Sequence, residues 1–250
     1  MARRIIIPAR YGSTRLPEKL LLPIKGKPLI LHTYERALAC DFDSVVVATD
    51  DQRIVDVLDK IGAEVCMTRE DHPSGTDRCA EAFTLLGYAD DDIIVNMQGD
   101  EPLLPKANIE QVAENLLLHP EAVIATLCDS LSEKTEVFNP NLVKVVFDRA
   151  QFALYFSRAP IPWSRDFFPA DLPEELYFFR HIGIYAYRGA FLKFYPALSQ
   201  SPLEQFESLE QLRVLWHGYR IHVDHARESS PPGVDTAANL QEVKRILEAR

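Results

Sequence analysis

The sequence has few cysteines, no long apolar run and less positive than negative charge, and each of these shortages argues against a class of protein. Its four cysteines stand far apart without a Cys-x-x-Cys pair, which argues against a zinc site and a disulfide framework. No apolar run approaches the ~20 residues that a membrane-spanning helix needs. The formal net charge of −10 argues against a nucleic-acid partner, because phosphate backbones are bound by broad positive surfaces.

The N-terminus shows no targeting segment. Residues Met1 to Arg4 lead directly into an apolar run, with no signal-peptide core or cleavage site. The scattered cysteines are expected to be buried free thiols of a reducing compartment. We therefore expect a cytoplasmic protein with neither a membrane nor a nucleic-acid partner. Its 250 residues, 47% hydrophobic and 26% charged, suit one globular domain with a substantial core.

Three common catalytic signatures are missing as well. The chain contains no G-x-G-x-x-G dinucleotide fingerprint and no Walker P-loop. It also contains no G-x-S-x-G nucleophile elbow of a hydrolase. A dinucleotide enzyme, a P-loop ATPase and a serine hydrolase are therefore disfavoured.

What the sequence does contain is a basic loop against an acidic background. Arg10, Arg15 and Lys19 follow the apolar run Ile5–Ile7, which predicts a buried strand, and Gly12 lies among them. Backbone N–H groups, forked arginine donors and a lysine charge at a strand end suit a polyanion such as a triphosphate. The alternative is a solvated turn without a ligand.

The first half of the chain alternates strand and helix patterns at the spacing of βα units. The predicted strands are Ile5–Ile7, Ser44–Thr49, Ala63–Met67, Ile93–Met97 and Ala122–Leu127. The predicted helices are Pro28–Ala39, a helix capped by Asp50-Asp51 that carries Ile54, Leu58 and Ile61, then Asp77–Leu86 and Ala107–Leu118. Apolar strands between amphipathic helices indicate an α/β fold with a mostly parallel central sheet and helices on both faces. In such sheets ligands bind beyond the carboxyl ends of the strands.

From about Asp129 the pattern changes. The predicted elements are a hairpin of Val143–Phe147 and Ala153–Phe156, a long Pro- and aromatic-rich loop over 160–173, a strand Phe178–Tyr187, a short helix Phe191–Tyr195, a helix Leu203–Trp216, a strand Ile221–Asp224 and a terminal helix from Ala237. We therefore expect a single domain, 1–250, in which residues 129–250 form an elaboration packed on the half 1–128.

Two carboxylates stand where a metal ion could bind. Asp100 comes directly after the strand Ile93–Met97, next to Gly99, and Asp235 precedes the terminal helix. Mg²⁺ prefers one or two protein carboxylates with phosphate oxygens and water, so Asp100 and Asp235 are candidate ligands. The alternatives are a solvent-facing turn at Asp100 and a helix N-cap at Asp235.

Two further groups of polar residues are candidates for binding. Ser74, Gly75 and Arg78 follow a strand and open a helix, which suits a nucleotide base or phosphate, with a plain serine cap as the alternative. The second half offers groups for a small anionic substrate, or alternatively for surface ion pairs: Arg158, Arg165, Arg180, His181, Glu207, Glu210 and Gln211. A cationic loop with metal-binding carboxylates predicts phosphoryl or nucleotidyl transfer.

Long segments of the chain narrow that prediction, because they resemble one family of nucleotidyltransferases. The segments are IIPARYGSTRLP, VVVATDD, GAEVCMTREDHPSGTDR, IIVNMQGDEPLLP, ALYFSRAPIPW, RHIGIYAYR, SPLEQFESLEQLRVLW and GVDTAANL. They are similar to the 3-deoxy-manno-octulosonate cytidylyltransferases, which are also called CMP-Kdo synthetases. Kdo is the sugar acid 3-deoxy-manno-octulosonate. Because the second half matches as well as the first, the likeness goes beyond the loop that sister families share.

The resemblance implies a Rossmann-like nucleotidyltransferase fold with a β-rich dimerisation insert in residues 129–250, and a homodimer. It implies transfer of a cytidylyl group from CTP to the anomeric hydroxyl of a Kdo-type sugar, with Mg²⁺ as cofactor, in lipopolysaccharide biosynthesis. By this likeness the triphosphate is held by Arg10, Arg15 and Lys19, the cytidine by Ser74, Gly75 and Arg78, and Mg²⁺ by Asp100 and Asp235. The sugar acid is bound by Gln98, Arg158, Arg165, His181, Tyr185, Glu210 and Gln211. Lys19, Asp100 and Asp235 form the implied catalytic group.

The chain departs from the family pattern at two places. The family loop usually reads R-L-P-G-K-P, whereas here Glu18 stands at the glycine and Leu20 at the proline. The segment Ser229–Asp235 is richer in proline than its family counterpart. Both changes bear on CTP affinity and on the choice of sugar. An 8-amino-Kdo, another ulosonic acid, and a catalytically silent nucleotide-binding relative are therefore kept as alternatives.

Overall fold

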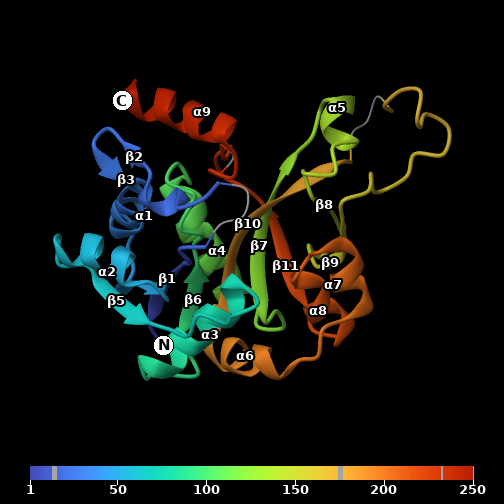
Figure 1. Cartoon of the computed structure of the whole chain (residues 1–250). Coiled ribbons are helices and arrows are strands. Elements are labelled where there is room, and N and C mark those ends of the chain that lie inside the picture. The colour runs from blue at the N-terminus through green and yellow to red at the C-terminus, as the bar shows by residue number, and fades with distance from the viewer. Residues whose placement is uncertain (13–15, 174–176, 232, 250) are drawn as a thin grey trace.

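The computed structural model describes residues 1–12, 16–173, 177–231 and 233–249. Its centre is a nine-stranded sheet built from both halves of the chain (Figure 1). The strands of this sheet are β1 (Arg3–Ala9), β4 (Ser44–Thr49), β5 (Glu64–Met67), β6 (Ile93–Asn96), β7 (Ile124–Ser130), β8 (Lys144–Phe147), β9 (Ala153–Ser157), β10 (Phe179–Arg188) and β11 (Ile221–His225). A separate short ribbon pairs β2 (Pro23–Ile24) with β3 (Lys27–Pro28).

The strand order confirms the prediction of a mostly parallel sheet. The main path runs β11-β7-β10-β6-β1-β4-β5, while β8 pairs with both β10 and β9. Neighbours along the path are parallel, except that β10 is antiparallel to β6 and to β7. The strands predicted in the first half therefore all occur and point the same way. Their carboxyl ends meet at one edge of the sheet, which is where ligands bind in folds of this kind.

Helices cover both faces of this sheet, as predicted. They are η1 (Lys19–Leu21), α1 (Leu29–Leu38), α2 (Gln52–Asp59), α3 (Gly75–Leu85), α4 (Lys106–Leu118), α5 (Lys134–Val137), α6 (Gly189–Phe194), η2 (Tyr195–Ala197), α7 (Pro202–Glu207), α8 (Gln211–Trp216) and α9 (Ala237–Glu248). Alternate residues of β1 divide the core: Ile5 and Ile7 pack with α1, α2, α4 and α9, whereas Ile6 packs with α3, α6 and α8. None of the described helices combines the length and the apolar character that crossing a membrane requires.

The second half of the chain is joined to the first inside the sheet. The strand β10 lies between β6 and β7, and Tyr185 on β10 pairs with Asn96 on β6. The boundary expected between residues 128 and 129 falls inside β7. The roles assigned to the two halves stay predictions, but their strands share one sheet. The predicted hairpin is confirmed, because β8 and β9 pair antiparallel.

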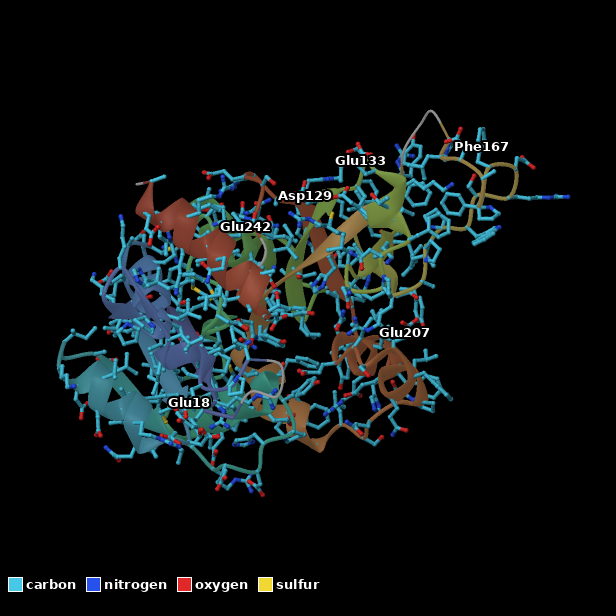
Figure 2. All side chains as sticks on the ribbon, turned by 45° about the horizontal axis from the view of Figure 1, so that its top comes forward. Glu18, Asp129, Glu133, Phe167, Glu207 and Glu242 are labelled. Carbon is cyan, nitrogen blue, oxygen red and sulfur yellow. The ribbon has the colours of Figure 1, made fainter. Side chains whose placement is uncertain are left out.

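The Pro- and aromatic-rich segment is the long loop predicted from the sequence. In Figure 1 it extends away from the body of the molecule between β9 and β10. Figure 2 places Phe167 in the outer part of this loop. The next residue, Phe168, packs in a small apolar cluster with Leu131, Val137 and Phe178. The loop is therefore anchored at its base beside α5.

Two helix predictions are wrong in their limits. The helix predicted over Leu203–Trp216 is two helices, α7 and α8, because Ser208 takes a left-handed conformation with φ 52° and ends α7. The helix predicted from Asp77 begins at Gly75, because the Ser74 hydroxyl accepts a hydrogen bond from the Asp77 N–H at 3.0 Å. Both differences place functional candidates at helix ends.

Candidate active site

Two cavities adjoin beyond the carboxyl ends of β1 and β6. The loop cavity has a volume of about 350 Å³ and includes Arg10, Lys19, Ser74, Arg78, Asp100 and Asp235 in its lining. The tyrosine cavity has a volume of about 250 Å³ and includes Thr76, Tyr185, Tyr187, Tyr195 and Gln211 in its lining. Both are lined by Gly75, Gln98, Glu101 and Glu210. These four shared residues mark the junction, where ligands in the two cavities would meet.

Lys19 and the two predicted metal-binding carboxylates come together in the loop cavity. The Lys19 ammonium contacts the Asp100 carboxylate and lies 3.0 Å from Asp235 Oδ1. Burial opposes the charge of Lys19, but the two carboxylates outweigh it and raise the pKa of the ammonium. Elements far apart in sequence supply this cluster: η1, the turn after β6 and the segment before α9. In this cluster one ammonium group lies between two carboxylates.

Asp100 and Asp235 are a chemically suitable pair for Mg²⁺, because hard cations prefer carboxylate oxygens. Within the described ranges no group of three or more His, Cys, Asp or Glu residues is arranged to hold a metal ion. A pair of protein carboxylates, completed by phosphate oxygens and water, is a usual ligand set for Mg²⁺. It differs from a closed structural site, in which the protein supplies all the ligands.

Glu101 adds a third acidic group at the junction of the cavities. Burial raises the pKa of Glu101 to about 8, and the nearby charges of Asp100 and Asp235 act in the same direction. Its backbone N–H donates to the Gln98 carbonyl at 3.2 Å, which closes the turn after β6. Glu101 was not among the residues selected from the sequence, although it stands next to Asp100 in the same turn.

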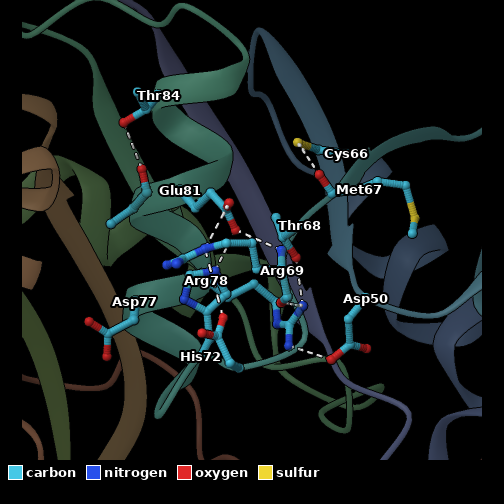
Figure 3. Close-up of polar contacts among 12 residues, drawn as sticks. Asp50, Cys66, Met67, Thr68, Arg69, His72, Asp77, Arg78, Glu81 and Thr84 are labelled. Atoms are coloured by element: carbon cyan, nitrogen blue, oxygen red, sulfur yellow. Dashed lines mark hydrogen bonds and ion pairs between the residues drawn. The ribbon is translucent and has the colours of Figure 1, made fainter.

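The N-terminus of α3 forms one wall of the loop cavity. Arg78 is only 3% exposed, and its guanidinium donates to Asp50 Oδ2 and to Thr68 Oγ1, both at 2.6 Å. Figure 3 shows this side chain turned toward Asp50 and Thr68. Ser74 is both the helix cap and a lining residue, so the two readings of Ser74 are compatible. Arg78 holds the wall in place while it lines the cavity.

Glu210 spans the two cavities from the start of α8. Thr76 Oγ1 donates to Glu210 Oε2 at 3.0 Å and lies 3.3 Å from the Tyr187 hydroxyl. Burial raises the pKa of Glu210, against the effect of the Thr76 hydroxyl that donates to it. Thr76, a second residue not selected from the sequence, thus orients a selected one. The small-residue run before α3 was its only sequence signal.

The predicted sugar-binding residues fall into two groups. Gln98, Tyr185, Glu210 and Gln211 line the tyrosine cavity. His181 stands behind Tyr185, with ring centroids 5.2 Å apart, and its Nε2 is 2.9 Å from Thr126 Oγ1. Burial lowers the pKa of His181 to about 3, so the imidazole is neutral near neutral pH.

The two predicted arginines do not join that group. The Arg158 guanidinium donates to the Glu207 carbonyl at 2.7 Å and to the Pro140 carbonyl at 3.1 Å, which ties β9 to the end of α7. Arg165 is exposed in the long loop. No Arg, Lys or His is among the described residues that line the tyrosine cavity.

The basic loop is only partly described. Arg10 is exposed and lines the loop cavity, whereas Arg15 lies outside the described residues. Glu18, which stands where the family pattern has glycine, has φ 57°, a left-handed conformation that glycine adopts freely. The neighbouring Glu18 carboxylate raises the pKa of the Tyr11 hydroxyl, and Arg53 stacks 3.4 Å from the Tyr11 ring centroid. Glu18 therefore acts on Tyr11 at the edge of the basic loop.

Comparison with known proteins relates this arrangement to one group of enzymes. Residues 4–221 match the model of a family described as cytidylyltransferase. The chain is 54% identical over 243 residues to the 3-deoxy-manno-octulosonate cytidylyltransferase of Francisella tularensis subsp. novicida, covering 97% of both chains. It is 56% identical over 246 residues to the enzyme of that name from Hahella chejuensis, covering 97% of this chain and 96% of that one.

Solved structures agree with these sequence matches. A CMP:2-keto-3-deoxy-manno-octonic acid synthetase complexed with CTP superposes with a TM-score of 0.90 at 43% identity, over 100% of this chain and 99% of that one. A cytidylyltransferase from Leptospira borgpetersenii superposes with a TM-score of 0.65 at 18% identity, over 100% of this chain and 88% of that one, which supports the fold alone.

Proposed function

The chain belongs to the 3-deoxy-manno-octulosonate cytidylyltransferase family, and on that premise we propose that it transfers a cytidylyl group from CTP to Kdo. The products are CMP-Kdo, for lipopolysaccharide biosynthesis, and pyrophosphate. The observation that carries the proposal is the cluster of Lys19, Asp100 and Asp235 in the lining of the loop cavity, which adjoins the tyrosine cavity. One cavity is available for each substrate.

The loop cavity takes CTP. Arg10 and Lys19 face the triphosphate from the basic loop, and Arg15 belongs to the same set by its place in the sequence. Ser74, Gly75 and Arg78 form the wall against the cytidine. Cationic donors fixed beside the phosphates stabilise the charge that develops as the phosphoryl group is transferred.

Asp100 and Asp235 would hold Mg²⁺, which would supply positive charge to the phosphate oxygens and to the attacking hydroxyl. Lys19 already contacts both carboxylates, so it offsets part of their negative charge and limits their repulsion of the triphosphate. Binding of Mn²⁺, followed by its paramagnetic resonance, tests the assignment without turnover. Asp100→Asn should weaken this binding and abolish turnover, whereas the exposed control Asp41→Asn should change neither. Near-wild-type binding in Asp100→Asn would contradict the assignment.

The tyrosine cavity takes the sugar acid. Gln98, Glu210 and Gln211 offer hydrogen bonds to its hydroxyl groups, while Tyr185 offers an apolar face and His181 supports that ring. The anomeric oxygen attacks the α-phosphorus of CTP, the bond to pyrophosphate breaks, and the hydroxyl proton is released. Gln98 and Glu210 line both cavities and are therefore placed beside this exchange.

Arg158 and Arg165 stay predictions for the sugar carboxylate. Arg158 lies at the base of the α7–α8 turn and acts on the tyrosine cavity through that turn, because Glu207 and Ser208 accept its hydrogen bonds. Arg165 stands in the long loop, outside the described lining of either cavity. A carboxylate role for Arg165 therefore requires the loop or a second chain to bring it to the sugar.

The proposed assembly is a homodimer formed through the second half of the chain. Leu154 on β9 is 62% exposed and Phe206 on α7 is 90% exposed, on elements joined by a 2.6 Å hydrogen bond from Ser157 to Glu207. A second copy of the chain would cover these apolar groups. Light scattering should show a dimer that Phe206→Asp weakens and that Phe194→Asp, on α6, leaves intact. A monomeric parent protein would contradict this assembly.

A cytoplasmic location is proposed with it. The four cysteines are buried free thiols, which suits a reducing compartment. Fractionation of cells that make the untagged chain should recover it with cytoplasmic markers.

The first test of the function is pyrophosphate release from CTP with Mg²⁺ and one of three acceptors: Kdo, 8-amino-Kdo or N-acetylneuraminate. Release with Kdo alone is the expected result. Release with 8-amino-Kdo or with N-acetylneuraminate would assign one of the alternative acceptors. Binding of CTP without release for any acceptor would identify a silent relative, which the intact cluster of Lys19, Asp100 and Asp235 disfavours.

A further inference from the structure

Glu101 stands out among the four residues shared by the two cavities. Gly75 has no side chain, the Gln98 amide donates to Asn96 Oδ1 at 3.0 Å, and Glu210 accepts from Thr76. The carboxyl group of Glu101, in contrast, accepts no hydrogen bond from any residue in the described part of the chain. It is the shared acceptor that the protein itself leaves unused.

The position of this side chain is fixed by backbone packed against it. A Cβ atom at Gly233 would lie 3.1 Å from Glu101 Cγ, and one at Gly183 would lie 3.9 Å from Glu101 Oε1. Gly183 belongs to the irregular stretch of β10 between Ile182 and Tyr185, where the pairing with β7 shifts register. Two glycines from different elements thus make room for the carboxyl group beside the junction.

Glu101 is only partly buried and lines both cavities. A ligand that displaces solvent from its carboxyl group must offer a hydrogen bond in return. The hydrogen bonds of Lys19 go to Asp100 and Asp235 instead. A sugar hydroxyl group can either donate to the carboxyl group or accept from it, whereas a phosphate oxygen of CTP cannot donate a hydrogen bond.

We propose that Glu101 is an additional contact for the acceptor sugar and accepts a hydrogen bond from one of its hydroxyl groups at the junction of the cavities. This inference rests on the proposed function, since it needs a polyhydroxylated acceptor in the tyrosine cavity. Glu101 then selects for a hydrogen-bond donor next to the reacting end of the sugar. The contact is separate from those of Gln98 and Glu210, which have protein partners of their own.

The test compares Glu101→Ala and Glu101→Gln with the control Glu242→Ala, which changes an exposed residue on α9. Loss of this hydrogen bond should raise the KM for Kdo by roughly tenfold in Glu101→Ala. Glu101→Gln keeps an acceptor oxygen and should lose less. The KM for CTP, calorimetric CTP binding and the Mg²⁺ concentration for half-maximal rate should stay within about twofold of the parent values.

Kdo analogues that each lack one hydroxyl group identify the contact. One analogue should be a poor substrate for the parent protein, and its disadvantage should disappear in Glu101→Ala. Equal losses for CTP or Mg²⁺ would overturn the proposal in favour of a role at the metal site. The proposal would also be overturned if every analogue were as poor a substrate for Glu101→Ala, relative to Kdo, as it is for the parent protein. If Glu101→Ala does not fold, the same analogue series with Glu101→Gln decides. Failure of the parent protein to use any acceptor would instead contradict the proposed function.

Discussion

Thr236, and not its neighbour Asp235, caps the N-terminus of α9. The Thr236 hydroxyl accepts a hydrogen bond from the Asn239 N–H at 3.2 Å, and the Asn239 side chain accepts one from the Thr236 N–H. The helix-cap alternative for Asp235 is therefore wrong, and its carboxylate bonds Lys19 instead. One residue of offset separates a group that stabilises a helix from a group of the proposed metal site.

This offset predicts opposite effects for two adjacent substitutions. Thr236→Ala should lower the free energy of unfolding by about 1 kcal/mol, because it removes the cap, and should keep most of the activity. Asp235→Asn should abolish most turnover while it lowers stability little. Urea unfolding and pyrophosphate release measure the two effects. A large loss of activity in Thr236→Ala with none in Asp235→Asn would reverse the assignment.

Glu18 predicts a stabilising substitution in the basic loop. Its left-handed backbone, φ 57°, is unfavourable for any residue with a Cβ atom. Glu18→Gly should therefore raise the free energy of unfolding by up to about 1 kcal/mol, less the extra entropy that glycine gains in the unfolded chain. Glu18→Ala keeps the Cβ atom and with it the unfavourable left-handed backbone, so it should not be stabilising. Equal stability of the two variants in urea unfolding would contradict this explanation.

His222 predicts a loss of stability in acid. It is 1% exposed, neither ring nitrogen has a hydrogen-bond partner among the described residues, and its ring stacks on His119 with centroids 3.7 Å apart. Burial, with the neighbouring His119, lowers the pKa of His222 from 6.5 to about 4. Between these values the unfolded chain binds more protons than the folded one, so unfolding becomes easier as pH falls.

His222→Phe should remove this dependence. As the pH falls from 6.5 toward 4, the parent should lose up to about 1.4 kcal/mol of unfolding free energy per pH unit relative to His222→Phe. The control His217→Phe changes an exposed ring and should follow the parent. Parallel pH profiles for the parent and His222→Phe would show that the buried imidazole is not the cause.

The two predicted arginines should respond differently to truncation. Arg158→Ala removes donors from the carbonyls of Pro140 and Glu207 and should cost about 1–3 kcal/mol of stability. It should also raise the KM for the sugar, because the α7–α8 turn loses its support. Arg165→Ala should change stability by less than about 0.5 kcal/mol, since the side chain is exposed. Equal thermal shifts for the two variants would contradict the structural role of Arg158.

Much of the fold was predictable because its signals are local. The apolar strand Ser44–Thr49 and the helix that follows Asp51 occur as expected, since each pattern of burial repeats within a few residues. The position of β10 was not predictable in this way. Its pairing with Asn96 on one side and Thr126 on the other depends on residues about 60 to 90 positions away.

The candidate site, too, could be predicted from the sequence only in part. The pattern placed Asp100 at the end of a strand, and the structure brings it to Lys19 and Asp235. The sequence could not separate Arg158, whose donors meet backbone carbonyls, from a ligand-binding arginine, because a carbonyl partner leaves no side-chain signal. The importance of Glu101 also depends on what is absent around it, namely the side chains of Gly183 and Gly233.

The insertion of β10 between β6 and β7 has a consequence for engineering this enzyme. A fragment that ends at Cys128 would retain β6 and most of β7 but lose both β10 and β11, leaving one edge of β6 and both edges of β7 open to pairing with other chains. The second half of the chain, the proposed acceptor-binding part, is therefore not a detachable module. Exchanging it with that of a relative would replace the middle of the sheet, so changes of acceptor are better sought in single side chains around the tyrosine cavity.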